Sequence, residues 1–376
     1  VHSAIEEASR CKISVSIAGG RHSMGGQQFG TDTIHLDMRS FNSIVQFDRV
    51  NGLIEVESGI MWPELIRYLH ENQDGQETVW SVRQKQTGID KVSIGGSLSS
   101  NIHGRGLKFP PFNSDIESFR MINHAGDHLE CSREQNSELF SLAIGGYGLF
   151  GVVTHVTLRL VPRQVVKRMV EIIAVRNLLP RIEAAMDEGF IYGDCQYSID
   201  LAGDEEFHPG VFSCYKPVAA DTPVPEQKKQ MAPSDWAALY QLARTDKAKA
   251  FSQYEHFYLG TSGQVYWSDA HQLSNVFEGY NEAVASKPET EMITEIYVRA
   301  ESLVPLMVDV RRDFIKHQVD MTYGTIRFIE PDTESFLRWA TERCVCIVCN
   351  LHIKHTPEGI EKAKADFRRI IDRVIE

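Results

Sequence analysis

Residues 17–27, near the start of the chain, have types and a spacing that could do chemistry. They read IAGGRHSMGGQ and follow an apolar alternation of Ile13, Val15 and Ile17, which predicts a strand. Glycines after a strand leave backbone N–H groups free to face a phosphate and let a ligand approach the main chain. His22, in the middle, offers a nucleophilic ring nitrogen. The segment therefore predicts a loop that grips a phosphate-bearing ligand and bonds to it.

This loop differs from the two common phosphate-binding fingerprints. Gly-x-Gly-x-x-Gly does not lead from the strand into a helix, and Gly-Lys-Ser/Thr is absent. Residues 28–38 alternate like a second strand, so we expect the loop to lie between two strands. Taken alone, the segment could equally be a glycine-rich turn with a solvated histidine.

Two later segments change this balance. Residues 92–106 read VSIGGSLSSNIHGRG, and residues 143–162 read AIGGYGLFGVVTHVTLRLVP. Both place small residues where backbone must come close to something flat or charged. In this order and spacing, the three segments resemble the FAD-binding half of the vanillyl-alcohol oxidase superfamily. The sugar-alcohol and aldonolactone oxidoreductases are the most similar branch, and cytokinin dehydrogenases share the Arg-His-Ser-x-x-Gly-Gln form of the first loop.

The resemblance implies a bound FAD and a role for His22. This residue stands where the family has the histidine that bonds to the flavin, so a covalent link is expected; a histidine that only packs against FAD is the alternative. The second, cysteine link of some members is not expected, because residues 94–106 contain no cysteine. The cofactor-binding residues implied are Ala18, Gly19, Gly20, Arg21, His22, Ser23, Gly25, Gln27, Ile94, Gly95, Gly96, Ser97, Asn101, His103, Gly151 and Val152.

A catalytic arginine is implied in the second half of the chain. Thr325-Ile326-Arg327 matches a Glu-x-Arg of the sugar-alcohol oxidase branch. Arg327 would then meet the flavin and the substrate hydroxyl, and would stabilise negative charge as hydride arrives. Thr325 replaces the carboxylate of that branch, which puts polyol specificity in question. An ordinary surface arginine is the alternative.

Four further polar residues are candidates for the substrate pocket. Asn350 and His352 are two apart on a predicted strand and so share a face. His352 could accept the proton of an alcohol, although a structural histidine is the favoured interpretation. Glu295 and Tyr297 share a face of the preceding strand, as pocket groups or as ordinary sheet-face residues.

The composition of the chain limits which classes of partner it can bind. Its 376 residues are enough for two domains, and 42% hydrophobic with 24% charged residues is ordinary for a globular protein. The net charge of −12 opposes nucleic acid or an anionic membrane surface as a partner. No apolar run reaches the length of a membrane span and no signal peptide is visible. We therefore expect a cytoplasmic protein without a membrane span; the oligomeric state stays open.

The seven cysteines do not indicate a disulfide framework, because their number is odd and they are scattered. Cys344, Cys346 and Cys349 cluster, which suggests either a metal site or a buried strand that uses cysteine as a small apolar residue. No second cysteine pair stands at zinc spacing. We favour the buried strand and expect no metal.

The predicted fold class is α+β. Residues 1–164 would form a two-subdomain FAD-binding domain of the PCMH type, and residues 165–376 a substrate, or cap, domain with an antiparallel sheet covered by helices. Expected cap elements are strands over 165–175, 196–201, 292–298, 324–329 and 345–353, helices over 303–317 and from 356 onward, and a surface excursion over 217–236. The resemblance also implies that a segment before residue 1 and a return segment after residue 376 are missing.

Together these features predict an FAD-dependent oxidase or dehydrogenase acting on CH–OH groups. It would oxidise a hydroxyl of a small polar substrate, such as a sugar, polyol or aldonolactone, and pass electrons to O₂ or an external acceptor. An FAD dehydrogenase of an unrelated alcohol or amine, and a truncated or inactive flavin-binding module, are the alternatives. A nicotinamide dehydrogenase is disfavoured by the missing fingerprint.

Overall fold

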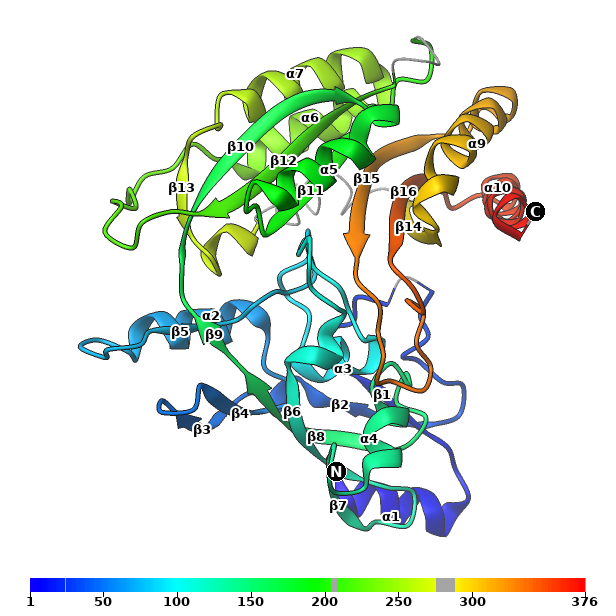
Figure 1. The fold of residues 1–376 in the computed structure, drawn as a ribbon. Coiled ribbons are helices and arrows are strands. Elements are labelled where there is room, and N and C mark those ends of the chain that lie inside the picture. Colours follow the sequence, from blue (N-terminus) through cyan, green and yellow to red (C-terminus); the bar gives the residue numbers. More distant parts are fainter. Residues whose placement is uncertain (24, 204–207, 275–287, 376) are drawn as a thin grey trace.

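The computed structural model describes residues 1–23, 25–203, 208–274 and 288–375. In Figure 1 the blue-to-cyan part of the chain forms one half of the molecule, and the green-to-red part forms the other. Each half is built on its own sheet with helices against it. The predicted α+β class is confirmed.

The first half contains a small parallel pair and a five-stranded antiparallel sheet. The pair is β1 (Val15–Ala18) with β2 (Ile34–Asp37), preceded by helix α1 (His2–Cys11). The sheet has the order β3-β4-β8-β6-β7. Its strands are β3 (Ile44–Asp48), β4 (Leu53–Glu57), β6 (Ile116–Ile122), β7 (His128–Ser132) and β8 (Val152–Arg159), and its helices are α2 (Trp62–Glu71), α3 (Ile94–Ser100) and α4 (Ser137–Ala143).

The second half is a seven-stranded sheet in which every pairing is antiparallel, in the order β13-β10-β12-β11-β15-β16-β14. Its strands are β10 (Val165–Ala174), β11 (Tyr192–Tyr197), β12 (Pro209–Pro217), β13 (Val265–Trp267), β14 (Glu289–Val298), β15 (Met321–Ile329) and β16 (Cys344–Lys354). Its helices are α5 (Leu178–Asp187), α6 (Pro233–Thr245), α7 (Lys247–Leu259), α9 (Leu303–His317) and α10 (Pro357–Ile375). A two-residue pair joins β5 (Trp80–Ser81) of the first half to β9 (Val161–Pro162), which directly precedes β10 in the sequence.

The two faces of the large sheet have different partners. One face carries Phe212, Ile326 and Ile347 and packs on α5, α9 and α10 in a continuous apolar core. The other face is divided. Val170 and Val211 pack under α6 and α7, whereas the β15–β16–β14 end turns toward the first half of the chain. Polar residues on that end therefore lie at the boundary between the halves.

Several elements differ from the sequence-based expectation. The bounds of the strand expected over 196–201 were wrong. Strand β11 begins at Tyr192 and ends at Tyr197, and the chain leaves the sheet after it. Helices α5, α6 and α7 were not predicted, and α6 begins inside the expected surface excursion, at Pro233. The cysteine cluster does lie in a buried strand, with Cys346 and Cys349 in the cores on opposite faces of β16. All seven cysteines are free thiols.

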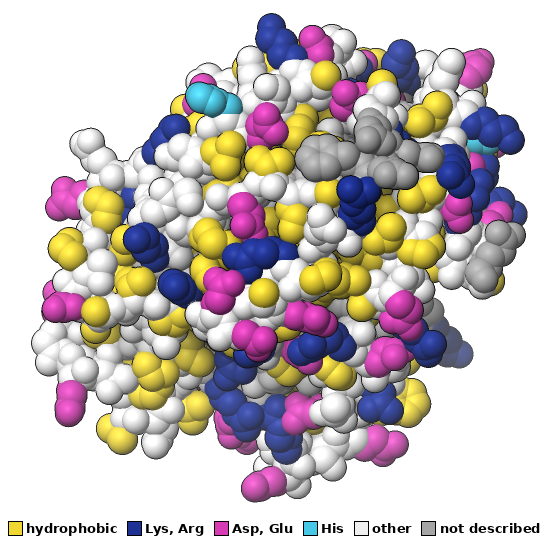
Figure 2. Space-filling view, turned by 45° about the horizontal axis from the view of Figure 1, so that its top comes forward, with side chains coloured by type: hydrophobic (Ala, Val, Ile, Leu, Met, Phe, Trp, Pro, Cys, Tyr) yellow, Lys and Arg dark blue, Asp and Glu magenta, His cyan; other side chains and the backbone are white. Residues whose placement is uncertain are grey.

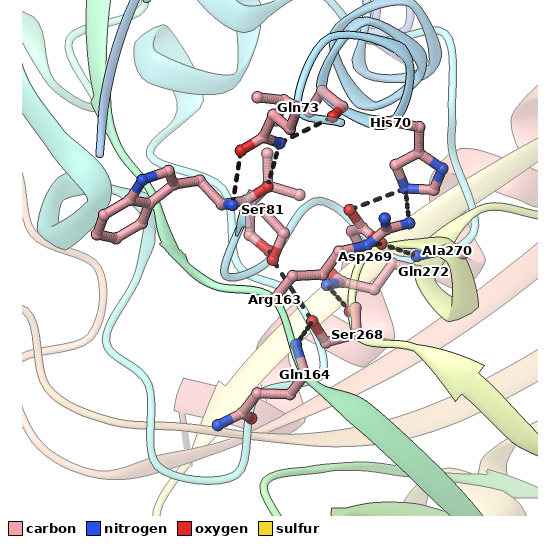
Figure 3. A network of polar contacts seen from close by, with 12 residues as sticks. His70, Gln73, Ser81, Arg163, Gln164, Ser268, Asp269, Ala270 and Gln272 are labelled. Carbon is pink, nitrogen blue, oxygen red and sulfur yellow. Dashed lines mark hydrogen bonds and ion pairs between the residues drawn. The ribbon is translucent and has the colours of Figure 1, made fainter. Parts of the chain in front are cut away.

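A buried polar network ties the halves together on one side (Figure 3). Asp269, fully buried in the second half, accepts hydrogen bonds from His70 Nε2 at 3.0 Å and from Arg163 Nε at 3.3 Å. Gln272 Oε1 accepts the backbone N–H of Lys85 at 2.9 Å. These contacts fix the first half against the β10 side of the large sheet.

The surface in Figure 2 shows Lys and Arg side chains interspersed with Asp and Glu, without a continuous basic stripe on this face. Of the helices that the structure describes, none is long and apolar enough to cross a membrane.

Candidate functional site

The first glycine segment joins β1 to β2, so its expected place between two strands is confirmed. Gly19 and Gly20 lie against the chain that enters α3. A Cβ on Gly19 would overlap the Ser93 hydroxyl, and a Cβ on Gly20 would overlap the Lys91 carbonyl oxygen. Both glycines are therefore needed for the contact between the first and second glycine segments. A Cβ on Gly25 would lie 3.1 Å from its nearest neighbour, the Gln27 side chain.

His22 is half-buried in this loop, against the Lys91 backbone. Burial lowers the pKa of His22 below its ordinary value; a hydrogen bond with the Lys91 backbone partly offsets this, and the charge of Lys91 lowers the pKa further. The ring is therefore neutral at neutral pH, which is the form that can act as a nucleophile.

The other candidate residues of this loop are mostly exposed. Ala18 is buried at the end of β1, whereas Ser23 and Gln27 reach the surface. Arg21 adopts a left-handed backbone with φ 59° and pairs with Asp37 at 3.0 Å. The guanidinium of Arg21 thus already has a protein partner. A bound pyrophosphate would share this guanidinium with Asp37.

The second glycine segment contains the short helix α3. The backbone N–H groups of Ile94, Gly95, Gly96 and Ser97 all have protein acceptors, which are Ile60 O, Ser58 O, Ser93 Oγ and Ser93 O. The hydroxyl of Ser97 accepts from Trp62 Nε1 at 3.0 Å. These four residues pack α3 onto the five-stranded sheet, and their proposed contact with FAD stays a prediction.

The third glycine segment packs on α3 and on β6. Gly145 N donates to Leu98 O at 3.0 Å, which joins the second and third segments. Gly151 has φ 144°, and a Cβ there would overlap the Ile122 carbonyl oxygen. Val152 is buried and pairs with Ile122 in the sheet. The three glycine segments, far apart in sequence, therefore lie together as the resemblance implied.

Asn101 has a role that the sequence did not predict. It is fully buried, caps α3 in a left-handed conformation, and donates from Nδ2 to Asp332 Oδ2 at 2.8 Å. Its Oδ1 accepts the backbone N–H of Asn113 at 2.9 Å. Asp332 belongs to the β15–β16 hairpin, which in Figure 1 reaches down to the first half. The side chain expected to line the cofactor thus holds the two halves together.

A buried polar cluster forms where the β14–β16 end of the large sheet meets the segment after α3. His103 Nε2 lies 3.5 Å from Glu295 Oε2, and Arg327 Nη1 lies 3.8 Å from Glu295 Oε1. Tyr297 Oη donates to Glu295 Oε2 at 2.6 Å. Burial raises the pKa of Glu295, but His103 and Arg327 lower it more, to about 2. Glu295 is thus a carboxylate at all ordinary pH values, held by three groups.

Arg327 is almost fully buried in this cluster, so the surface-arginine alternative is wrong. Its Nη2 donates to the Thr87 carbonyl oxygen at 3.4 Å, while its Nε and Nη1 have no hydrogen-bond partner among the residues that the structure describes. His103 Nε2 is likewise buried, and within the described chain it makes no hydrogen bond besides its ion-pair contact with Glu295. These atoms can serve a bound ligand.

The carboxylate that Thr325 lacks comes from another strand. Thr325 Oγ1 donates to the Cys195 carbonyl oxygen at 3.2 Å, away from Arg327. Thr325 and Glu295 both lie opposite Val348 in the register of the sheet, so they share a row and a face. Glu295 reaches Arg327 from that row. The resemblance to the Glu-x-Arg pattern thus located the arginine but not its acidic partner.

His103, Glu295 and Cys346 also bring one donor atom each to within 4.8 Å of one another, a set that could hold a metal ion. The guanidinium of Arg327 beside Glu295 opposes a cation at this place.

His352 and Asn350 do not join Arg327. Cys346, the cross-strand partner of Arg327, lies roughly 20 Å from His352 along β16 at the usual strand rise. His352 Nδ1 lies 2.8 Å from Glu291 Oε1, and the residue borders a cavity of about 240 Å³ near α10. The expectation that His352 acts with Arg327 was wrong, because sharing a face does not bring residues together along a strand. The catalytic role of Asn350 stays a prediction.

Lys85 and Arg105 were missed as site residues. Lys85 is fully buried next to the cluster, and its Nζ contacts Asp90 Oδ1 at 2.7 Å. Burial lowers its pKa, which Asp90 partly restores, to about 8. Arg105 follows His103 by two residues and lies 4.0 Å from Asp194 of β11. The signal for Arg105 was its place in the second glycine segment; no pattern pointed to Lys85.

Comparison with known proteins gives the first half a family. A model described as an FAD binding domain matches residues 1–132. Over 139 residues the chain is 31% identical to a D-arabinono-1,4-lactone oxidase from Debaryomyces hansenii. The matched region covers 37% of this chain and 24% of that protein. Over 154 residues the chain is 30% identical to cytokinin dehydrogenase 9 from Oryza sativa subsp. japonica, covering 40% and 28%. The matched regions thus span about a quarter of the length of these two relatives.

The whole fold also has a counterpart. A structure of alkyldihydroxyacetonephosphate synthase superposes with a TM-score of 0.68 and covers 100% of this chain and 69% of that one. The sequences are 12% identical, so this likeness speaks for the fold alone. It includes the large sheet as well as the first half.

Proposed function

We propose that this chain is an FAD-dependent oxidoreductase of the vanillyl-alcohol oxidase family, because a model described as an FAD binding domain matches residues 1–132. Its redox centre lies at the polar cluster of His103, Glu295 and Arg327. The observation that carries the proposal is the buried guanidinium of Arg327, whose Nε and Nη1 have no hydrogen-bond partner among the described residues, at the boundary between the FAD-binding domain and the large sheet. Such atoms cost free energy unless a ligand accepts their hydrogen bonds.

The residues present fit FAD. The loop of residues 19–27 would bind the pyrophosphate through backbone N–H groups, the glycine segments at α3 and after α4 would line the cofactor, and His22 would bond to it. When bound, FAD supplies an acceptor for the hydride of a CH–OH group. The neutral ring of His22 supports a covalent link, because attack requires an unprotonated nitrogen.

Arg327 would carry the electrostatic part of the reaction. Its charge is fixed in a buried place by Glu295, so no reorganisation is needed as negative charge develops nearby. Glu295 in turn is oriented by Tyr297. This arrangement supports a positioning role for Glu295 and Tyr297 and a catalytic role for Arg327.

We assign to His103 the role of the base that accepts the proton of the substrate hydroxyl. Its Nε2 faces Glu295, which would stabilise the imidazolium formed when the ring accepts a proton. His352, the earlier candidate, is remote from the cluster and paired with Glu291.

The substrate class is a hydroxyl compound of small size, as in the lactone-acting relative. A second candidate is an amine-linked substrate, which the cytokinin dehydrogenase match favours. O₂ or an external carrier would reoxidise the cofactor.

Anaerobic mixing of the FAD-loaded protein with matched panels tests the function. The panels are sugars, polyols, lactones, hydroxy acids and N⁶-substituted adenines, and the readout is loss of the flavin absorbance. The proposal expects reduction by one hydroxyl class. Failure of every class in a protein that binds FAD stoichiometrically would favour the alternative of an inactive flavin-binding module.

A further inference from the structure

Arg105 lies at the tip of a loop that links the two halves of the molecule. The loop rises from α3 to the large sheet (Figure 1), where Gly193 N donates to the Arg105 carbonyl oxygen at 2.8 Å and Leu107 N donates to Ile191 O at 2.9 Å. These backbone bonds hold Arg105 beneath β11, next to the polar cluster. Its side chain is 13% exposed.

A second buried guanidinium lies near it. Arg168 of β10 donates from Nε to Ser213 Oγ at 2.8 Å and lies over the rings of Tyr215 and Tyr258. Arg105 Nη1 donates to the Tyr215 hydroxyl at 3.3 Å. Tyr215 therefore contacts both guanidinium groups, and the buried region around it is aromatic and cationic.

Positive charge exceeds negative charge in this buried region. Lys85 pairs with Asp90, and Arg327 pairs with Glu295. Arg105 has only Asp194, at 4.0 Å, and Arg168 has no carboxylate within ion-pair distance among the described residues. Among the residues that the structure describes, four buried cations thus share three carboxylates.

The hydrogen bonding is incomplete as well. Arg105 Nε is buried and has no partner in the described part of the chain. His271, whose ring centroid lies 4.4 Å from that of Tyr215, adds no charge, because burial, with the charges of Arg105 and Arg168, holds its pKa well below the ordinary value. One buried positive charge and one N–H donor are left over, and a single anionic group would satisfy both.

We propose that the substrate of this enzyme carries an anionic group, a carboxylate or a phosphate. Arg105 binds this group directly, and the unpaired charge of Arg168 nearby stabilises it. The inference rests on the proposed function, since it names the substrate class of that site. The carboxylate of Asp194 lies 4.0 Å from Arg105 and also acts electrostatically on Arg327, so the anion subsite and the redox centre are neighbours. The hydroxyl to be oxidised would lie toward Arg327 and His103, and the anionic end toward Tyr215.

Calorimetric binding at constant ionic strength tests the subsite without turnover. The probes are matched pairs: D-gluconate with sorbitol, and glucose 6-phosphate with glucose. The unmutated FAD-loaded protein should bind one anionic member at least tenfold more tightly than its neutral partner. Arg105→Met should remove that preference, and Arg67→Met, at an exposed arginine of α2, should leave it unchanged.

A second variant guards against misfolding. Arg105→Met with Asp194→Asn removes both members of the loose pair and leaves no unpaired carboxylate, and it should also lose the preference. Equal binding of charged and neutral probes, no binding of any anion, or an unchanged preference in both variants would overturn the subsite. Anion binding that depends on Arg105, without flavin reduction by any hydroxyl compound, would instead overturn the proposed redox function and leave the subsite standing.

Discussion

Arg327 Nη1 and Glu295 Oε1 lie 3.8 Å apart although their strands, β15 and β14, are separated in the sheet by β16. The long side chains reach across the intervening strand on one face, where they meet His103 from the FAD-binding domain. Both halves of the molecule thus contribute to one buried cluster, and changes in it should affect stability and chemistry together.

The acidic limb of the stability profile should depend on Glu295. Its pKa falls from an ordinary 4.5 to about 2 in the folded protein, so its stabilising contribution is full above pH 4.5 and is lost as the pH falls toward 2. Glu295→Gln should be less stable than the unmutated protein at pH 7, and the difference should shrink below pH 4.5. Denaturant unfolding at several pH values measures this. A pH-independent difference, or the same profile in the exposed control Glu226→Gln, would contradict the assignment.

His22 should hold FAD covalently. After acid precipitation the flavin should stay with the protein pellet, and His22→Ala should release it. Because burial lowers the pKa of His22, loading of the apoprotein with FAD should continue at full rate below the usual imidazole range and slow only at lower pH. Flavin that leaves the unmutated protein on precipitation would contradict the covalent link but not the binding of FAD.

Gly20 and Gly25 should respond differently to enlargement. Gly20→Val places atoms on the Lys91 carbonyl oxygen, so we expect loss of flavin and a destabilisation on the order of 3 kcal/mol. At Gly25→Val the nearest described atoms belong to the flexible Gln27 side chain, so this variant should lose flavin with little change in stability. Flavin content and thermal unfolding of both variants measure this. Normal flavin occupancy in both would place the pyrophosphate elsewhere.

Local patterns in the sequence predicted much of the fold. Alternation located β14, β15 and β16, and the amphipathic pattern located α9 and α10 with nearly correct ends. The glycine segments located the FAD-binding half. Helices α6 and α7 were missed because proline-rich and lysine-rich composition masked a weak helical pattern.

Contacts between the halves could not be predicted from spacing. Asn101 was expected at the cofactor, yet it binds Asp332, a residue with no local signal. Glu295 was named as a pocket group or an ordinary sheet-face residue, but its pairing with Arg327 depends on the strand order, which alternation does not reveal. His352 was assigned by face alone, and its distance along β16 separates it from the cluster.

The reduction potential of bound FAD tests the central claim, that Arg327 stands at the redox centre. A fixed positive charge stabilises the negative charge gained on reduction, so its removal should lower the two-electron potential. A loss of about 3 kcal/mol corresponds to roughly 60 mV. Arg327→Ala should keep its flavin and fall by about that amount, and Arg327→Lys should fall less. An unchanged potential in Arg327→Ala with full flavin content would contradict the account.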